Sequence, residues 1–164
     1  MFNTKKYLLP LFALACAAPA LAQAADGPKF YRFDFVVKEV EAGKVVNARN
    51  YSTMLGTNPP PASIRSGTRL PYSSGGSTQY IDLGVNIDIR ELKETPQGEL
   101  SVYITADIST AAQDNPGSLP LIRQNKWTGI VLVPIKKAAT LFSSDDLASK
   151  RQLQLEVTAT PLAR

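Results

Sequence analysis

Apolar side chains recur at every second position in two runs within residues 80–111. The runs are Ile81, Leu83, Val85, Ile87 and Ile89, followed by Leu100, Val102, Ile104, Ala106 and Ile108. A period of two gathers side chains on one face of a β-strand, whereas a helix cannot place them on a single stripe. Between the runs, residues 94–98 contain the Pro and Gly of a turn. We therefore expect an antiparallel hairpin with one apolar face and one polar face.

The rest of the chain has strand patterns and almost no helical periodicity. Further strands are expected at residues 30–41, 45–55, 64–70, 121–133, 138–142 and 152–160. Together with the hairpin they predict an all-β fold, either an antiparallel β-sandwich or a partly open barrel of about eight strands with little helix. The one helical turn that we expect lies in residues 143–151, where Ser144, Asp145 and Asp146 are typical of a helix N-cap.

Two of these strands also carry predictions about burial. In residues 45–55, Val46, Ala48 and Met54 lie opposite the polar positions and predict the inward face of that strand. Residues 130–133, Ile-Val-Leu-Val, are apolar at consecutive positions. Such a run predicts a strand that is buried on both faces.

Residues 1–22 have the organisation of a bacterial Sec signal peptide. Lys5 and Lys6 give a basic start, residues 7–15 form an apolar run too short to span a bilayer, and residues 20–22 form a small-residue cleavage site. We therefore expect an exported chain that is periplasmic or associated with the outer membrane. Residues 23–29 are then a flexible lead-in, and residues 30–164 form a single all-β domain large enough for a core.

Cys16 offers an alternative interpretation of the same segment, because a cysteine at the end of an apolar run can be lipidated. Under either interpretation Cys16 is the only cysteine, so no disulfide is expected. Loss of Lys5 and Lys6 lowers the formal net charge from +4 to +2. The remaining basic residues are spread thinly and indicate no nucleic-acid partner. Membrane association stays compatible with the sequence, but not through a transmembrane helix.

Histidine is absent from the whole chain, which removes several classes of chemistry. Ser-His and Cys-His pairs need it, as do the usual zinc and haem sites. The sequence also has no Gly-rich phosphate loop and no nucleophile-elbow motif. We therefore expect no catalytic residue, no cofactor and no metal, and we interpret the chain as non-enzymatic.

Asp82, Asn86, Asp88 and Arg90 are the candidate binding residues on the polar face of the hairpin. They occupy alternate positions of one strand and therefore share a face. Two carboxylates and an amide are compatible with a calcium site or with an acid/base pair. The solvated face of an amphipathic strand, partly paired with Arg90, explains the same residues without a ligand, and this interpretation is favoured.

The same hairpin resembles the core hairpin of the secretin β-domain. Residues 80–89 (YIDLGVNIDI), 98–104 (GELSVYI) and 107–109 (DIS) are similar to its Gly-Val-x-Leu-x-Val strand, the turn and a strand that ends near a Ser. Residues 67–71 (GTRLP) are similar to the family's Gly-x-x-Val-Pro element, and residues 120–133 to its next strand, which has an Arg and then an apolar run. The similarity covers roughly residues 64–162.

The resemblance also has limits that bear on function. Secretins continue into a Gly-Gly-Leu motif and a gate segment rich in Pro and Gly, whereas residues 140–144 of this chain read Thr-Leu-Phe-Ser-Ser. The gate segment and the modular N-terminal domains of secretins have no counterpart in the sequence. The resemblance therefore implies a secretin-like core without the channel, and no catalytic residue is implied by it.

The leading hypothesis is a non-enzymatic periplasmic or envelope β-domain, secretin-like in its core and accessory to secretion. It would bind envelope proteins or associate with itself through sheet edges, which are natural pairing surfaces. Two alternatives remain: a small outer-membrane β-barrel, with which the alternation is compatible, and a carboxylate-based hydrolase that uses Asp82 or Asp88.

Overall fold

The computed structural model describes residues 27–58, 60–74, 76–112, 121–146 and 149–163. The predicted signal peptide lies outside these residues. Eight strands occur in the described part: β1 (Phe30–Glu41), β2 (Lys44–Gly56), β3 (Ala62–Ser74), β4 (Ser77–Glu94), β5 (Glu99–Ala112), β6 (Leu121–Pro134), β7 (Ala138–Asp145) and β8 (Arg151–Pro161). Within the same residues there is no helix that could cross a membrane.

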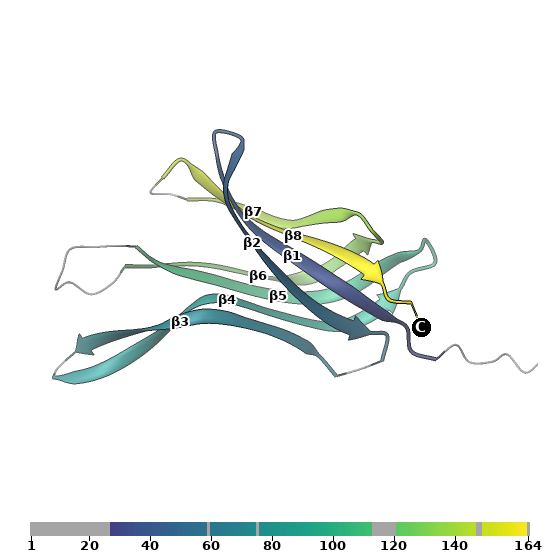
Figure 1. The fold of residues 1–164 in the computed structure, drawn as a ribbon, viewed down its shortest axis with the longest axis horizontal. Helices are drawn as coiled ribbons and strands as arrows, with labels where there is room; N and C mark the ends of the chain where they lie inside the picture. The colour runs from purple at the N-terminus through teal and green to yellow at the C-terminus, as the bar shows by residue number, and fades with distance from the viewer. Residues whose placement is uncertain (1–26, 59, 75, 113–120, 147–148, 164) are drawn as a thin grey trace, which may run out of the picture.

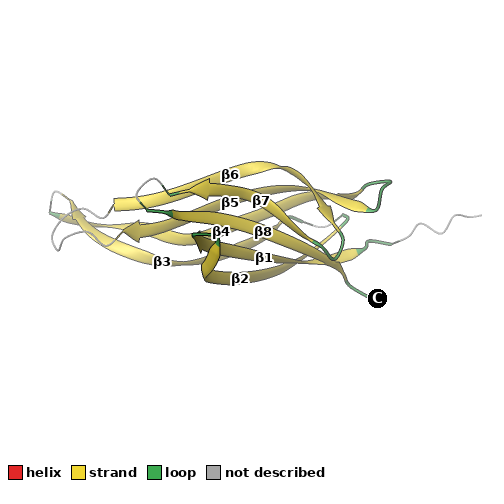
Figure 2. Cartoon of the chain, turned by 90° about the horizontal axis from the view of Figure 1, so that it is seen from above, coloured by secondary structure: helices red, strands yellow, loops and turns green. Residues whose placement is uncertain are grey.

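The strands form two antiparallel sheets of four. One sheet has the order β2-β1-β8-β7 and the other has the order β3-β4-β5-β6. The sheets pack face to face as two layers, and they diverge toward the end that carries the β3–β4 hairpin (Figure 1). Seen from above, both layers run along the long axis of the molecule (Figure 2). The predicted antiparallel sandwich of eight strands is therefore confirmed.

The core lies between the two layers and is built from the alternating residues of the sequence. Phe33 and Phe35 of β1 are fully buried, and so are Ile87 and Ile89 of β4. The remaining fully buried large side chains are Leu100, Val102, Ile104, Val133, Leu155 and Val157. The predicted apolar face of the central hairpin is thus the face that packs against the other sheet.

A β-bulge near the end of β4 changes which side chains reach the core. The pairing of β4 with β5 shifts register between Arg90 and Lys93. Glu91 has a positive φ of 56° within this shift. Simple alternation would point Glu91 inward, but the extra residue instead directs Leu92 inward, where it is only 4% exposed.

Two predictions about strand faces are wrong. In β2, Val46 is 50% exposed and Met54 is 63% exposed, and Ala48 is exposed as well. The register pairs Phe35 with Tyr51, which packs against the core. Directly paired residues point to the same side of a sheet, so the inward set of β2 is the other one. The pattern of β2 is weak, and its pairing with β1 decides the face.

The prediction of a doubly buried strand at residues 130–133 is also wrong. β6 is the last strand of its sheet, with β5 on one side only. Val133 is buried, but Ile130 and Leu132 point outward and are 67% and 57% exposed. The expected helical turn is also not seen at its N-cap residues, because Ser144 and Asp145 belong to β7.

Candidate binding face

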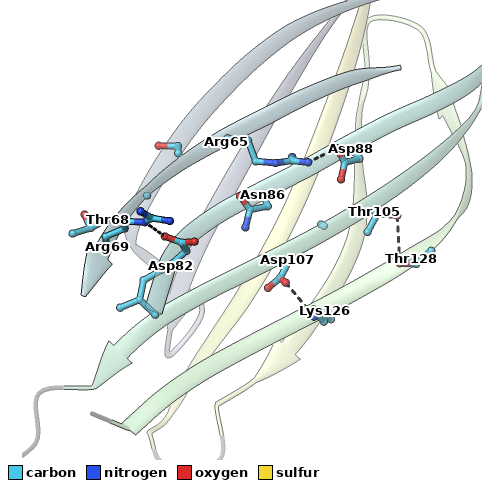
Figure 3. Close-up of a pocket in the computed structure, with 14 residues that line it drawn as sticks. Arg65, Thr68, Arg69, Asp82, Asn86, Asp88, Thr105, Asp107, Lys126 and Thr128 are labelled. Atoms are coloured by element: carbon cyan, nitrogen blue, oxygen red, sulfur yellow. Dashed lines mark hydrogen bonds and ion pairs between the residues drawn. The ribbon is translucent and has the colours of Figure 1, made fainter. Parts of the chain in front are cut away.

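The outward side chains of β3, β4, β5 and β6 line a polar groove of about 780 Å³ (Figure 3). Its charged and amide residues are Arg65, Arg69, Asp82, Asn86, Asp88, Asp107 and Lys126. Three of the four predicted binding residues, Asp82, Asn86 and Asp88, therefore lie together in one groove. They come from the polar face of β4, as the alternation indicates.

Asp88 is held by two neighbours from β3. Its Oδ1 accepts hydrogen bonds from the Ser63 hydroxyl at 2.6 Å and from the Arg65 guanidinium at 2.7 Å. Burial by itself raises the pKa of Asp88, but the bonds from Ser63 and Arg65 and the charges of Arg65 and Arg90 outweigh it and lower the pKa below its ordinary value. Asp88 is therefore a carboxylate at neutral pH and not a proton donor.

The other two acidic residues of the groove are paired as well. Asp82 Oδ1 accepts a hydrogen bond of 2.8 Å from Arg69 Nε, and both side chains are 72% exposed. Asp107 accepts bonds of 2.9 and 3.0 Å from the Gln124 amide and lies 3.3 Å from Lys126 Nζ. The groove thus has three basic side chains on its outer strands β3 and β6, and three acidic side chains on the inner strands β4 and β5.

Arg90, the fourth predicted residue, does not line the groove. Its guanidinium lies 5.3 Å from the centre of the Tyr103 ring, in cation–π geometry. Arg90 and Tyr103 are direct partners in the β4–β5 register. Tyr103 is in turn the direct partner of Ile130 in the β5–β6 register, so this pair lies in one row with the exposed Ile130, next to the polar groove.

The chemistry of the groove is that of a hydrated, charge-balanced surface. Each of the three carboxylates already lies in an ion pair with a basic side chain: Asp88 with Arg65, Asp82 with Arg69 and Asp107 with Lys126. The groove therefore does not present the pair of one proton-donating and one proton-accepting carboxyl group that acid/base catalysis needs. In the described ranges, no three His, Cys, Asp or Glu side chains are grouped so that they would hold a metal ion. The arrangement therefore supports polar surface contacts more than acid/base chemistry.

The free edge of β6, the last strand of its sheet, is a second candidate binding feature, and the sequence interpretation does not single it out. No charged residue and no proline occurs from Trp127 to Val133. Trp127 points inward and stacks on Phe142 of β7, with 6.4 Å between ring centres. The sequence signal for this edge is the apolar run of residues 130–133, which predicts burial on both faces but has one exposed face in the structure. We call the side of β6 (Leu121–Pro134) that faces away from β5 the β6 edge.

A second cavity, of about 740 Å³, lies between the diverging ends of the sheets. Its floor contains Ile108 and Leu153, and its walls are polar. Arg123 of β6 crosses it to Asp146, which follows β7, at 3.1 Å. This ion pair joins the two sheets where the apolar core ends.

The fold of the chain is similar to that of secretin domains in solved structures. The secretin InvG of the Salmonella SPI-1 type III secretion injectisome gives a TM-score of 0.50 at 8% identity, over 84% of this chain and 64% of that chain. A second structure of the InvG secretin domain gives 0.53 at 7% identity, over 84% and 62%. The type II secretin GspD of enteropathogenic Escherichia coli gives 0.52 at 8% identity, over 84% and 67%.

These similarities show the fold, and the predicted resemblance to the secretin β-domain is confirmed at that level. The chain spans less than two thirds of the length of the InvG chains. No family model matches the chain. No curated protein matches it in sequence.

Proposed function

We propose that this protein is a non-enzymatic β-domain of the bacterial cell envelope that acts by protein–protein binding at a sheet edge, in a role accessory to secretion. The signal-peptide pattern of residues 1–22 supports an exported protein that reaches the periplasm or the outer membrane. The secretin-domain fold supports the link to secretion. Neither the groove nor the composition supports a catalytic role.

The observation that carries this proposal is the β6 edge. A strand with a partner on one side only presents unpaired backbone N–H and C=O groups on the other. Soluble proteins usually protect such edges with charge, proline or short length. β6 has 14 residues, and its half from Trp127 to Val133 has neither charge nor proline. An added strand would pair with this backbone and cover Ile130 and Leu132 in part.

The other long edges are less suited to strand addition. β3 contains Pro71, which has no N–H to donate. Its arginines are already engaged, Arg65 with Asp88 and Arg69 with Asp82. In β2, every residue from Lys44 to Asn50 is exposed, so this half of the strand has no packed face to support a partner.

A second copy of the chain is the alternative partner, because a free edge can pair with another copy of the same sheet. Association with other proteins is also seen in a solved structure of the Salmonella SPI-1 injectisome basal body, which contains the secretin InvG together with PrgH and PrgK. Both kinds of association use the same edge and respond to the same substitutions.

The test compares two matched double variants of the chain recovered after export. Ile130→Lys with Leu132→Lys places charge on the outward face of β6, where an added strand would lie alongside it. Val45→Lys with Val46→Lys places the same charge on the edge strand β2, where both valines are about half exposed. Association is measured by light scattering during size-exclusion chromatography and by retention of envelope proteins on the immobilised chain. Thermal unfolding verifies that each variant folds.

We expect the wild type and the β2 variant to associate and the β6 variant to lose association at least tenfold, because buried charge at a pairing edge is unfavourable. A wild-type chain that stays monomeric and retains no envelope protein contradicts the proposal. Equal behaviour of the two variants contradicts the assignment to β6.

A further inference from the structure

We propose that the strand received by the β6 edge belongs to a different protein and carries acidic residues at both of its ends. This inference rests on the proposed function, because it names the chemistry of the partner at the same edge. Its basis is the distribution of charge among the strands.

Charge differs between the outer and the inner strands of the sheet β3-β4-β5-β6. The edge strands β2, β3 and β6 each contain two basic residues and no acidic residue: Lys44 and Arg49, Arg65 and Arg69, Arg123 and Lys126. The fourth edge strand, β7, contains Asp145 and no basic residue. The inner strands β4 and β5 contain six acidic residues beside Arg90 and Lys93: Asp82, Asp88, Glu91, Glu94, Glu99 and Asp107. Within the sheet β3-β4-β5-β6, both outer strands are therefore basic and both inner strands hold the acids.

This pattern disfavours pairing between two copies of that sheet. Joining β6 of one copy to β3 of another, or to a second β6, brings basic strands together without an acidic residue on either. Joining it antiparallel to β7 of another copy would set Asp145 toward Lys126, but the lysines that precede β7 would lie toward Lys136, so only one end would be complementary. Like charges that face each other across paired strands are destabilising, and lysine on an edge is a known obstacle to edge-to-edge association. A strand with acidic residues reverses the sign of this interaction.

Lys126 is placed to contact such a strand. Its side chain is 69% exposed and lies on the outward face of β6, 3.3 Å from Asp107. Asp107 also accepts two hydrogen bonds from the Gln124 amide, at 2.9 and 3.0 Å. Lys126 can therefore turn to an incoming carboxylate while Asp107 keeps a hydrogen-bond donor.

The opposite end of the edge is basic as well. Lys136 and Lys137 follow β6 in the turn to β7, and both are exposed. From Leu121 to Lys137 the sequence has four basic residues and no acidic one. The stretch between Lys126 and Lys136 is free of charge. The complementary strand is therefore apolar in its middle, acidic at its ends and about nine residues long, enough to pair from Lys126 to Pro134.

The experiment uses two labelled nine-residue peptides, capped at both termini, with the chain recovered after export. One is Glu-Val-Thr-Val-Thr-Val-Thr-Val-Glu, and the other has Lys in place of both Glu residues. Dissociation constants are measured by fluorescence anisotropy at low and at high salt. The variant Lys126→Glu tests the edge, and Lys44→Glu, at an exposed basic residue of β2, is the matched control.

We expect the acidic peptide to bind at least fivefold more tightly than the basic one, with the difference shrinking at high salt as the charges are screened. Lys126→Glu should remove or reverse this preference, and Lys44→Glu should leave it unchanged. Equal affinity for the two peptides, or a preference for the basic one, overturns the inference.

Failure of this inference and failure of the proposed function are distinguishable. If neither peptide binds but the wild type associates with itself and the double lysine variant of β6 does not, the β6 edge pairs with a second copy and only the acidic-strand inference fails. If neither peptide binds and that variant associates like the wild type, both fail.

Discussion

The Tyr31 hydroxyl donates a hydrogen bond of 2.6 Å to Glu94 Oε1, which joins β1 of one sheet to β4 of the other. Lys29 Nζ contacts the second oxygen of the same carboxylate at 2.9 Å. Tyr31 is only 4% exposed, so its hydroxyl lies at the boundary of the core. This contact fixes the two sheets at the end where the apolar core closes, opposite the end where they diverge.

Replacement of Tyr31 by Phe removes this link without leaving a cavity. We expect Tyr31→Phe to lower the free energy of unfolding by about 1.5 kcal/mol at neutral pH, as for a hydrogen bond to a charged acceptor. Urea unfolding measures the change. Tyr80→Phe is the control, because Tyr80 is 62% exposed, and it should change stability little. Equal effects of the two substitutions would show that the bond contributes nothing specific.

The same pair makes stability depend on pH at the alkaline end. Burial, the bond to Glu94 and the charge of Glu94 raise the pKa of Tyr31 from 10.0 to about 12. A raised pKa in the folded state contributes stability that is complete below pH 10 and is lost as the pH rises through about 12. Spectroscopic titration of the phenols in wild type and Tyr31→Phe should assign the late-titrating group to Tyr31. A wild-type profile without such a group contradicts this prediction.

At the acid end, the relevant group is Glu94. The bond from Tyr31 and then that from Lys29 lower the pKa of Glu94 below 4.5, against a smaller opposing effect of burial. A lowered pKa gives stability that is present above pH 4.5 and is lost as the pH falls through the folded-state pKa. Glu94→Gln should therefore flatten the decline in melting temperature on acidification. Glu91→Gln, on the exposed side of the bulge, should leave that decline as it is in the wild type.

Gly67 and Gly84 are paired across β3 and β4, where the two backbones approach too closely for a side chain. A Cβ on Gly67 would lie 2.0 Å from the Leu83 carbonyl oxygen, and one on Gly84 would lie 2.1 Å from that of Ser66. Gly84 also has a φ of 140°, a conformation that glycine alone adopts readily. Both glycines belong to segments that carry the resemblance to secretins.

We expect Gly67→Ala and Gly84→Ala each to destabilise the chain by about 3 kcal/mol or more, because backbone must move to admit the methyl group. Gly98→Ala is the control for backbone strain alone, since Gly98 has a φ of 79° and open space around it. It should cost about 1 kcal/mol. Similar melting temperatures for all three variants would refute the close-approach explanation.

The polar groove leads to a prediction about cations. Arg69, Arg65 and Lys126 each lie within 3.3 Å of a groove carboxylate, which leaves those oxygens partnered. We therefore expect millimolar calcium, or its removal by a chelator, to leave the melting temperature unchanged. A calcium-dependent rise that is lost in Asp82→Asn with Asp88→Asn would instead restore the calcium interpretation of this face.

Sequence patterns were sufficient for the strands whose two faces differ most. Phe33 and Phe35 in β1, and Ile87 and Ile89 in β4, alternate with polar residues and are all buried. Hydrophobic periodicity predicts such strands because one face must leave water. The same rule placed Asp82, Asn86 and Asp88 on one polar face, which the groove confirms.

Periodicity was insufficient where neighbours decide the environment. Residues 130–133 are apolar on both faces of an edge strand, and nothing within this segment specifies that the face of Ile130 and Leu132 is exposed. The inward face of β2 depends on its register with β1, and the position of Leu92 depends on a bulge at Glu91. Pairing order and bulges are relations between distant segments, so a single-segment pattern does not contain them.

Backbone amide hydrogen exchange along β6 tests the central claim most directly, because it reports which edge gains hydrogen bonds on association. The chain recovered after export is compared alone and after saturation with its partner strand. We predict slowed exchange in residues 127–133 of β6, with β2 and β3 unchanged. Slowed exchange in β2 or β3 while β6 stays as in the free chain would contradict the account.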